Sequence, residues 1–341
     1  MSDADDKAIG TANTMRERAG ESRAKMWLLL DADRFAVAAL LALFVFVSFI
    51  VASTVLRPSL QQEIQTTDTI ETIFSSMIGV VITGTTLVVT INQLVLSQET
   101  GPLGDQRKRM SDAMDYRTYA AELFEEAPPA HPSELLQQLV RTSEQRAAAL
   151  GRIVAENDDD DELRRQVSEF VESLQGNAEK VDDQLDDAEF GTFEVMTAAL
   201  NFNYSWKIYQ IERMTAEFGE SLSDDEDEAF ARLQTALSMF GPAREHIKTL
   251  YFQWALVDLS QYILYIAVPA IVVAGCMLTF VGAGTFPGTT FGINDIVWVT
   301  SAAFTVTTLP FLLFTSYVFR IATAAKRTLA IGPIVLRKPG E

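Results

Sequence analysis

The sequence predicts an all-α membrane protein with four transmembrane helices and a large cytosolic helical bundle inserted between the second and the third. Three observations predict this fold. The chain contains four long apolar stretches, a strongly acidic segment separates the second from the third, and apolar residues recur at helical spacing within that segment. The 341 residues include 46 acidic and 27 basic ones, which gives a formal net charge of −19.

The four apolar stretches are long enough to cross a bilayer. They are Phe35–Leu56, Thr72–Leu96, Leu256–Val281 and Ile296–Phe319. Each contains about 22–26 residues and would form about 33–39 Å of helix, whereas the hydrocarbon core is about 30 Å thick. The first lies between Arg34 and Arg57 with no charged residue inside it. A charge at the bilayer centre would cost at least about 2.5 kcal/mol, so four such stretches predict four transmembrane helices.

The positions of the basic residues predict the orientation. Lysine and arginine cluster before the first and third stretches and after the second and fourth: Arg16, Arg18, Arg23, Lys25, Arg34, Arg107, Lys108, Arg109, Arg244, Lys248, Arg320, Lys326 and Arg327. The connection 57–71 has one arginine and 282–295 has no basic residue. Basic residues favour the cytosolic side, so we expect a multi-pass protein of the cell membrane with both termini in the cytosol.

These boundaries divide the chain into five parts. They are a cytosolic tail (1–34), transmembrane helices 1 and 2 (35–97), an acidic cytosolic helical bundle (98–252), transmembrane helices 3 and 4 (253–322) and a second cytosolic tail (323–341).

Three seams of apolar residues predict the helices of the bundle. The first repeats at spacings of three and four, as in a coiled coil, and the other two are less regular. Their members are Leu163, Val167, Phe170, Leu174, Ala178, Val181 and Leu185; Phe230, Leu233, Leu237, Phe240, Ile247 and Leu250; and Leu136, Leu139, Leu150 and Ile153. The second seam is expected to continue into the third transmembrane helix. The aromatic stretch Phe193–Ile211 is expected to form one buried helix, so the bundle should contain four or five antiparallel helices.

Two runs of acidic residues, Asp158–Glu162 and Asp224–Glu228, are expected at helix starts, where carboxylates interact favourably with the helix dipole. A calcium or magnesium site is the alternative interpretation. The first run does not fit an EF-hand loop, because Leu163 occupies the position that such a loop reserves for glycine. Ser223 and Glu226 have the spacing of a capping box and predict the start of the last bundle helix.

The sequence lacks the residue combinations of common enzymes. His131 and His246 are far apart in the sequence, and Cys276 lies inside the third apolar stretch without a neighbouring histidine. No phosphate-binding loop motif is present. We therefore expect no enzyme activity, no cofactor and no bound metal. Nucleic acid is not an expected partner for so acidic a surface.

The second apolar stretch carries a polar stripe. Its members repeat at alternating spacings of three and four: Ser76, Gly79, Thr83, Thr86, Thr90, Gln93 and Ser97. At 100° per residue they fall within an arc of about 100°. The fourth stretch carries a looser polar series: Asn294, Ser301, Thr305, Thr308 and Thr315. No ionisable residue lies near the middle of any stretch, which disfavours a proton- or sodium-coupled transporter.

Two interpretations of these stripes remain open. Small and hydroxylated residues allow close helix packing, and they can also line a path for ions when several copies assemble. We predict a homo-oligomeric passive ion or small-solute channel in the lipid bilayer, with a cytosolic regulatory bundle. The predicted path-lining residues are Ser76, Thr83, Thr86, Thr90, Gln93, Ser97, Ser301, Thr305 and Thr308. The alternative is a non-conducting membrane-anchored scaffold or sensor that binds a cytosolic protein partner.

The composition and layout resemble those of uncharacterised multi-pass membrane proteins of halophilic archaea. The resemblance is carried by the acidic bias, by an excess of arginine over lysine, by the four apolar stretches and by the segment Gly101–Met110 after the second. It implies a hypersaline cytoplasm, in which strong screening reduces repulsion between acidic groups.

Overall fold

The computed structural model of the chain describes residues 27–156, 160–186, 188 and 193–327. Most of both predicted tails therefore lies outside the described residues. The chain divides into two compact units. The acidic unit consists mainly of Pro102–Phe252, and the apolar unit consists of Trp27–Gly101 and Gln253–Thr323.

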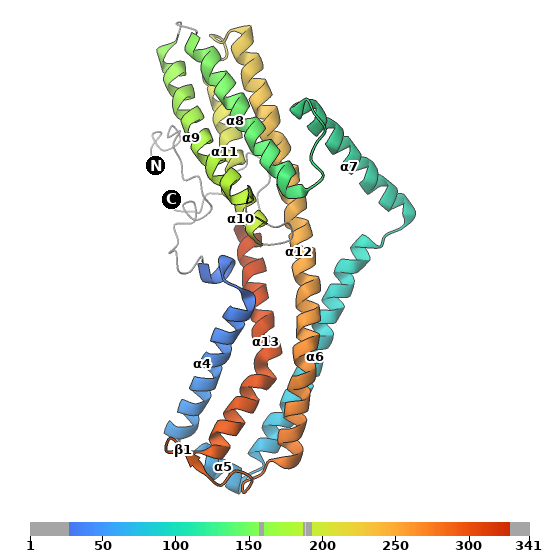
Figure 1. Cartoon of the computed structure of the whole chain (residues 1–341), viewed down its shortest axis with the longest axis vertical. Coiled ribbons are helices and arrows are strands. Elements are labelled where there is room, and N and C mark those ends of the chain that lie inside the picture. Colours follow the sequence, from blue (N-terminus) through green and yellow to red (C-terminus); the bar gives the residue numbers. More distant parts are fainter. Residues whose placement is uncertain (1–26, 157–159, 187, 189–192, 328–341) are drawn as a thin grey trace. The chain divides into compact units, whose positions relative to one another are not determined.

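The acidic unit is a bundle of helices. They are α7 (Leu103–Phe124), α8 (Pro132–Glu156), α9 (Asp161–Asp186), α10 (Phe193–Asn201), α11 (Tyr204–Phe218) and the first part of α12 (Asp224–Phe280). In Figure 1, α8, α9, α11 and the start of α12 run side by side. The seven residues of the first predicted seam are all buried on α9, and the buried members of the other two seams pack with them in one hydrophobic core. The sequence-based prediction of these core faces is confirmed.

Side chains at the helix starts satisfy backbone groups. Asp160 accepts hydrogen bonds from the backbone N–H groups of Glu162 and Leu163, each at 3.0 Å, and so caps α9. The Ser223 N–H donates to the Glu226 carboxylate at 2.9 Å, and the Glu226 N–H donates to Ser223 Oγ at 3.4 Å. The predicted capping box is therefore confirmed. Residues 158 and 159 of the first acidic run lie outside the described residues.

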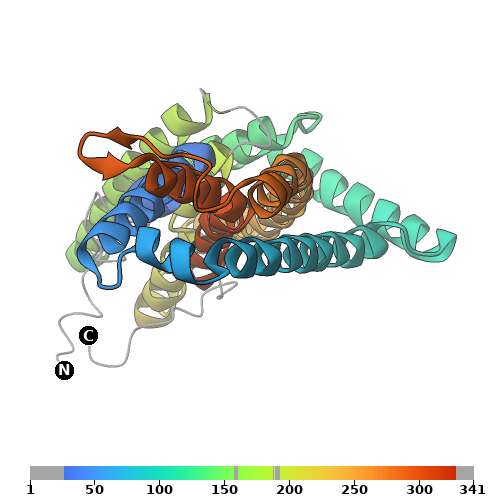
Figure 2. The same cartoon turned by 90° about the horizontal axis from the view of Figure 1, so that it is seen from below.

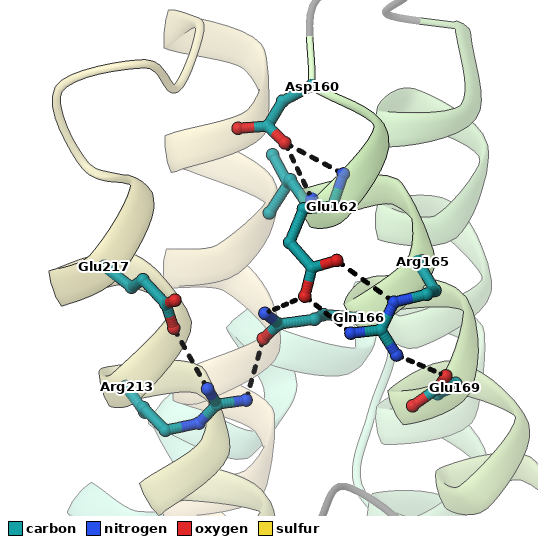
Figure 3. A network of polar contacts seen from close by, with 8 residues as sticks. Asp160, Glu162, Arg165, Gln166, Glu169, Arg213 and Glu217 are labelled. Atoms are coloured by element: carbon teal, nitrogen blue, oxygen red, sulfur yellow. Dashed lines mark hydrogen bonds and ion pairs between the residues drawn. The ribbon is translucent and has the colours of Figure 1, made fainter. Parts of the chain in front are cut away.

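A polar network connects α9 to α11 near the start of α9 (Figure 3). Gln166 donates to Glu162 at 2.9 Å and accepts from Arg213 at 2.8 Å. Arg213 also pairs with Glu217 at 3.0 Å. Arg165 is exposed and pairs with Glu162 within α9, and such exposed pairs contribute little to stability. Within this network, the hydrogen bond between Gln166 and Arg213 is the one that joins the two helices.

The prediction of one helix over Phe193–Ile211 is wrong, because α10 ends at Asn201 and α11 begins at Tyr204. A buried side chain of α9 occupies the break. Asn177 donates from Nδ2 to the Asn201 carbonyl at 2.9 Å, and its Oδ1 accepts from the Asn203 N–H at 3.2 Å. These bonds replace helical hydrogen bonds that the break removes.

The apolar unit contains four long helices and several short elements. They are the π-helical turn η1 (Trp27–Asp31), α4 (Arg34–Val55), α5 (Leu60–Thr66), α6 (Thr69–Glu99), the second part of α12, α13 (Asp295–Arg327) and the antiparallel strands β1 (Thr289–Thr290) and β2 (Ile293–Asn294). Figure 2 shows α4, α6, α12 and α13 from below. Helices α4, α6, α12 and α13 are long and apolar enough to cross a membrane.

The structure extends or refines three predicted segments. The third apolar stretch is part of the 57-residue helix α12, so the predicted continuation from the bundle is confirmed. The connection 57–71 contains α5, which follows a cis Arg57–Pro58 peptide bond and begins with a capping box of Ser59 and Gln62. The connection 282–295 contains the β1–β2 hairpin.

Two small hydrophobic cores and two arginines hold the apolar unit together. One core joins α5, α6, α12 and α13, and the other joins α4, α6, α12 and α13. Arg34 is only 3% exposed and donates to the Ser316 carbonyl of α13 at 3.2 Å. Arg320 of α13 donates to the Ala32 carbonyl at 2.6 Å, and Arg34 also donates to that carbonyl. These arginines connect the start of α4 with α13.

Candidate functional site

Helix α6 has a buried face and an exposed face. Ile70, Phe74, Val81 and Val88 are buried and pack toward the other helices of the apolar unit. Their spacing of four and seven residues places them on one side of the helix. The polar stripe lies on the side of α6 that faces away from this core.

The structure places all six predicted α6 residues on one exposed face. They are Ser76, Thr83, Thr86, Thr90, Gln93 and Ser97. The same stripe includes Gly79, where an added Cβ would meet no atom within 4 Å. A single chain therefore leaves this face open along much of the length of α6.

Four of the five hydroxyl groups of the stripe donate to the backbone of their own helix. Ser76 donates to the Thr72 carbonyl at 2.8 Å, and Thr86 donates to the Ile82 carbonyl at 2.9 Å. Thr90 donates to the Thr86 carbonyl at 2.9 Å, and Ser97 donates to the Leu94 carbonyl at 2.7 Å. A hydroxyl has one hydrogen and two lone pairs, so these groups keep acceptor capacity on their outer side. The stripe therefore offers oxygen acceptors more than donors.

The charged residues at the start of α6 are acidic, and acidic groups attract cations, as acceptor oxygens do. The helix contains no lysine, arginine or histidine. Asp68 and Glu71 are exposed at its first end. Acidic groups at the entrance to an uncharged polar surface raise the local concentration of cations. Among the residues that the structure describes, no group of three or more histidine, cysteine or acidic side chains could hold a metal ion.

The predicted residues of α13 lie in a different environment. Ser301 is fully buried and donates to the Val297 carbonyl at 2.6 Å. Thr305 and Thr308 are half-buried, and their hydroxyls also donate to carbonyls of α13, each at 2.8 Å. The structure thus brings the six α6 residues together on one open face but leaves Ser301 inside the apolar unit.

The structure also shows buried polar groups that were not among the predicted site residues. Thr85 Oγ1 and Asn92 Oδ1 of α6 and Thr300 Oγ1 of α13 are buried without a hydrogen-bond partner among the described residues. Such a buried group costs about 1–3 kcal/mol. The signal in the sequence was the presence of Thr85 and Asn92 on the otherwise apolar side of α6, opposite the stripe.

Comparison with known families shows to which family the chain belongs. A family of unknown function, DUF7972, matches residues 1–341. The chain belongs to the DUF7972 family. No curated protein and no solved structure matches it. The description of the family names no activity.

Proposed function

We propose that several copies of this chain assemble in a membrane into a passive channel for monovalent cations, with the polar stripe of α6 lining the path. The exposed stripe carries the proposal. Helix α6 is long enough to cross a bilayer, and six polar side chains lie exposed on one of its faces. An amide such as that of Gln93 is costly to place against acyl chains without a partner, so contact with water or with another copy would stabilise this face.

The chemistry of the stripe favours cations over anions. The hydrogens of the Ser76, Thr86, Thr90 and Ser97 hydroxyls are already donated to backbone carbonyls. Oxygen acceptors that face a path can replace part of the hydration shell of a cation, whereas an anion needs donors. The helix also lacks basic residues that would attract an anion.

The same surface favours passive conduction of monovalent ions. Between Glu71 and the last turn of α6 the helix contains no carboxylate. Neutral oxygens bind a cation weakly at several successive positions, and weak binding at many sites permits rapid passage. A divalent ion prefers carboxylate ligands, and a coupled transporter usually places an ionisable group near the bilayer midplane.

Ion flux through purified protein in liposomes at molar KCl tests this proposal. The variant Thr86→Val/Thr90→Val removes two oxygens from the stripe without changing side-chain volume. Thr85→Val is the matched control, because it makes the same chemical change one residue away, on a half-buried side chain of the same helix. Loss of a hydrogen-bonding oxygen costs about 1 kcal/mol, so the double variant should lower flux by about 10-fold or more. The control should conduct like the wild type.

Two results would overturn the proposal. If wild-type protein in intact oligomers conducts no more than empty liposomes do, the stripe is a packing seam between copies. A non-conducting scaffold or sensor would then be the better interpretation. If Thr85→Val lowers flux as much as the double variant does, the path does not run along the exposed face of α6.

A further inference from the structure

The first half of α7 is an exposed amphipathic segment. Residues 102–115 are all exposed except Gln106, which is half-buried. The second half is held by the bundle, since the Tyr116 hydroxyl donates to the Met239 carbonyl at 2.8 Å and Arg117 donates to the Pro128 carbonyl at 2.7 Å. The acidic unit thus fixes one end of α7 and leaves the other end uncovered.

The uncovered half has an apolar line. Leu103, Met110 and Met114 are 86%, 65% and 51% exposed. At 100° per residue they lie within about 40° of one another, whereas Asp105 and Asp112 lie about 140–180° away from each of them. Three large apolar side chains on one exposed helix face indicate a surface that contacts something other than water.

Charge indicates what this surface contacts. Arg107, Lys108 and Arg109 are consecutive, in a chain whose net charge is −19. At 100° per residue Arg107 falls about 40° from the centre of the apolar line, whereas Lys108 and Arg109 fall about 140° and 120° from it. An apolar helix face with a basic residue at its edge is typical of helices that lie in the lipid interface, where the apolar side chains enter the acyl boundary and the basic ones meet anionic phosphates.

The connection between helices places this half of α7 near the end of α6. Helix α6 ends at Glu99 and α7 begins at Leu103. Consecutive Cα atoms are about 3.8 Å apart, so four steps reach at most about 15 Å. The headgroup layer on each side of a bilayer is about 5–8 Å thick. If α6 crosses the membrane, the first turn of α7 therefore lies within about 15 Å of the end of α6 and can reach the headgroup layer.

We propose that the first half of α7 lies on the membrane surface, with Leu103, Met110 and Met114 in the acyl boundary and Arg107 at anionic lipid headgroups. This inference requires α6 to cross the membrane, but it does not require the protein to conduct ions. It assigns α7 a partner, an anionic lipid surface, that is distinct from the stripe of α6.

Spin labels on the full-length protein test the proposal. In a Cys276→Ala background, labels are placed by Met110→Cys and Met114→Cys, and by Asp112→Cys on the opposite helix face. The protein is reconstituted in vesicles of phosphatidylglycerol and phosphatidylcholine. The accessibility of each label to oxygen, which concentrates in lipid, is compared with its accessibility to a water-soluble nickel chelate. The oxygen-to-nickel ratio should be several-fold higher at positions 110 and 114 than at 112.

The headgroup contact has its own test. Arg107→Gln should lower the ratio at position 110 in dilute buffer and change it less at 1 M salt, because the screening length falls from about 10 Å at 0.1 M to about 3 Å. Equal ratios at the three labelled positions would place α7 in water and overturn the proposal. Low access of both reagents at position 110, with dipolar broadening between labels, would show a second copy on this face and also overturn it.

Discussion

Replacing Asn177 by leucine is expected to open the region around the α10–α11 break. Asn177 is fully buried and makes three hydrogen bonds, to the Asn201 carbonyl, the Asn203 N–H and the Lys207 ammonium. Two of these bonds join neutral groups and contribute about 1 kcal/mol each, and the bond from Lys207 at 2.8 Å contributes about 1.5–3 kcal/mol. Leucine has a similar volume, so the loss comes from the polar contacts and amounts to about 4 kcal/mol in total.

Hydrogen exchange followed by mass spectrometry measures this loss locally in the full-length protein. Exchange from a locally opened state reports the free energy of opening, and 4 kcal/mol corresponds to a fall in protection on the order of 10³-fold. The fall should be confined to peptides that cover α10 and α11. Lys180→Leu, an exposed polar-to-leucine change in the next turn of α9, should change stability by less than about 0.5 kcal/mol.

Protection within tenfold of wild type in Asn177→Leu would refute the reasoning that Asn177 fixes the break. The same conclusion would follow if Lys180→Leu and Asn177→Leu lowered protection equally.

Three other changes have defined outcomes. Ser223→Ala should lower the free energy of unfolding of the bundle by about 1 kcal/mol in urea titrations, because it removes one side of a capping box. Arg34→Leu should lower the thermal unfolding temperature in detergent, and Arg34→Lys should not restore it, since one ammonium cannot replace a guanidinium that reaches carbonyls on both sides of the α4–α13 contact. Burial, followed by the charge of Asp182, raises the pKa of Glu144. The native state therefore binds this proton more tightly than the unfolded state does, and stability contributed by this group falls as pH rises from the ordinary carboxyl pKa through the raised one. Glu144→Gln should flatten that part of the stability curve in urea titrations repeated at several pH values.

The elements with a clear repeat were the ones that the sequence could predict. Four long apolar stretches correspond to four helices that could cross a membrane, because unbroken apolar runs of this length have few other structural uses. The buried face of α9 was also predictable, since Leu163 and Leu185 belong to one seam with spacings of three and four. The capping box before α12 was predictable for a different reason, because its sequence signal is local.

The features that were missed depend on contacts between distant residues. The break between α10 and α11 is stabilised by Asn177, which lies 24 residues before Asn201 in the chain. Local propensity at Phe202 and Asn203 gives no sign of it. Helix α5 is only seven residues long and lies in a connection that hydropathy alone predicts to be a loop.

The candidate site was predictable in part. The stripe of α6 was visible as a repeat, and the structure adds that this face is open and that its hydroxyls donate to their own helix. The burial of Ser301 was not predictable, because periodicity on α13 does not show which side of the helix faces its neighbours.

Chemical block of a single introduced cysteine tests the central claim most directly. Thr90→Cys in a Cys276→Ala background is reconstituted in liposomes, and potassium flux is measured before and after a positively charged methanethiosulfonate reagent. A cation path along the stripe predicts rapid loss of flux in Thr90→Cys and unchanged flux in the matched Thr85→Cys protein. Unchanged flux in Thr90→Cys, with complete labelling shown by mass spectrometry, would contradict a path along this face of α6.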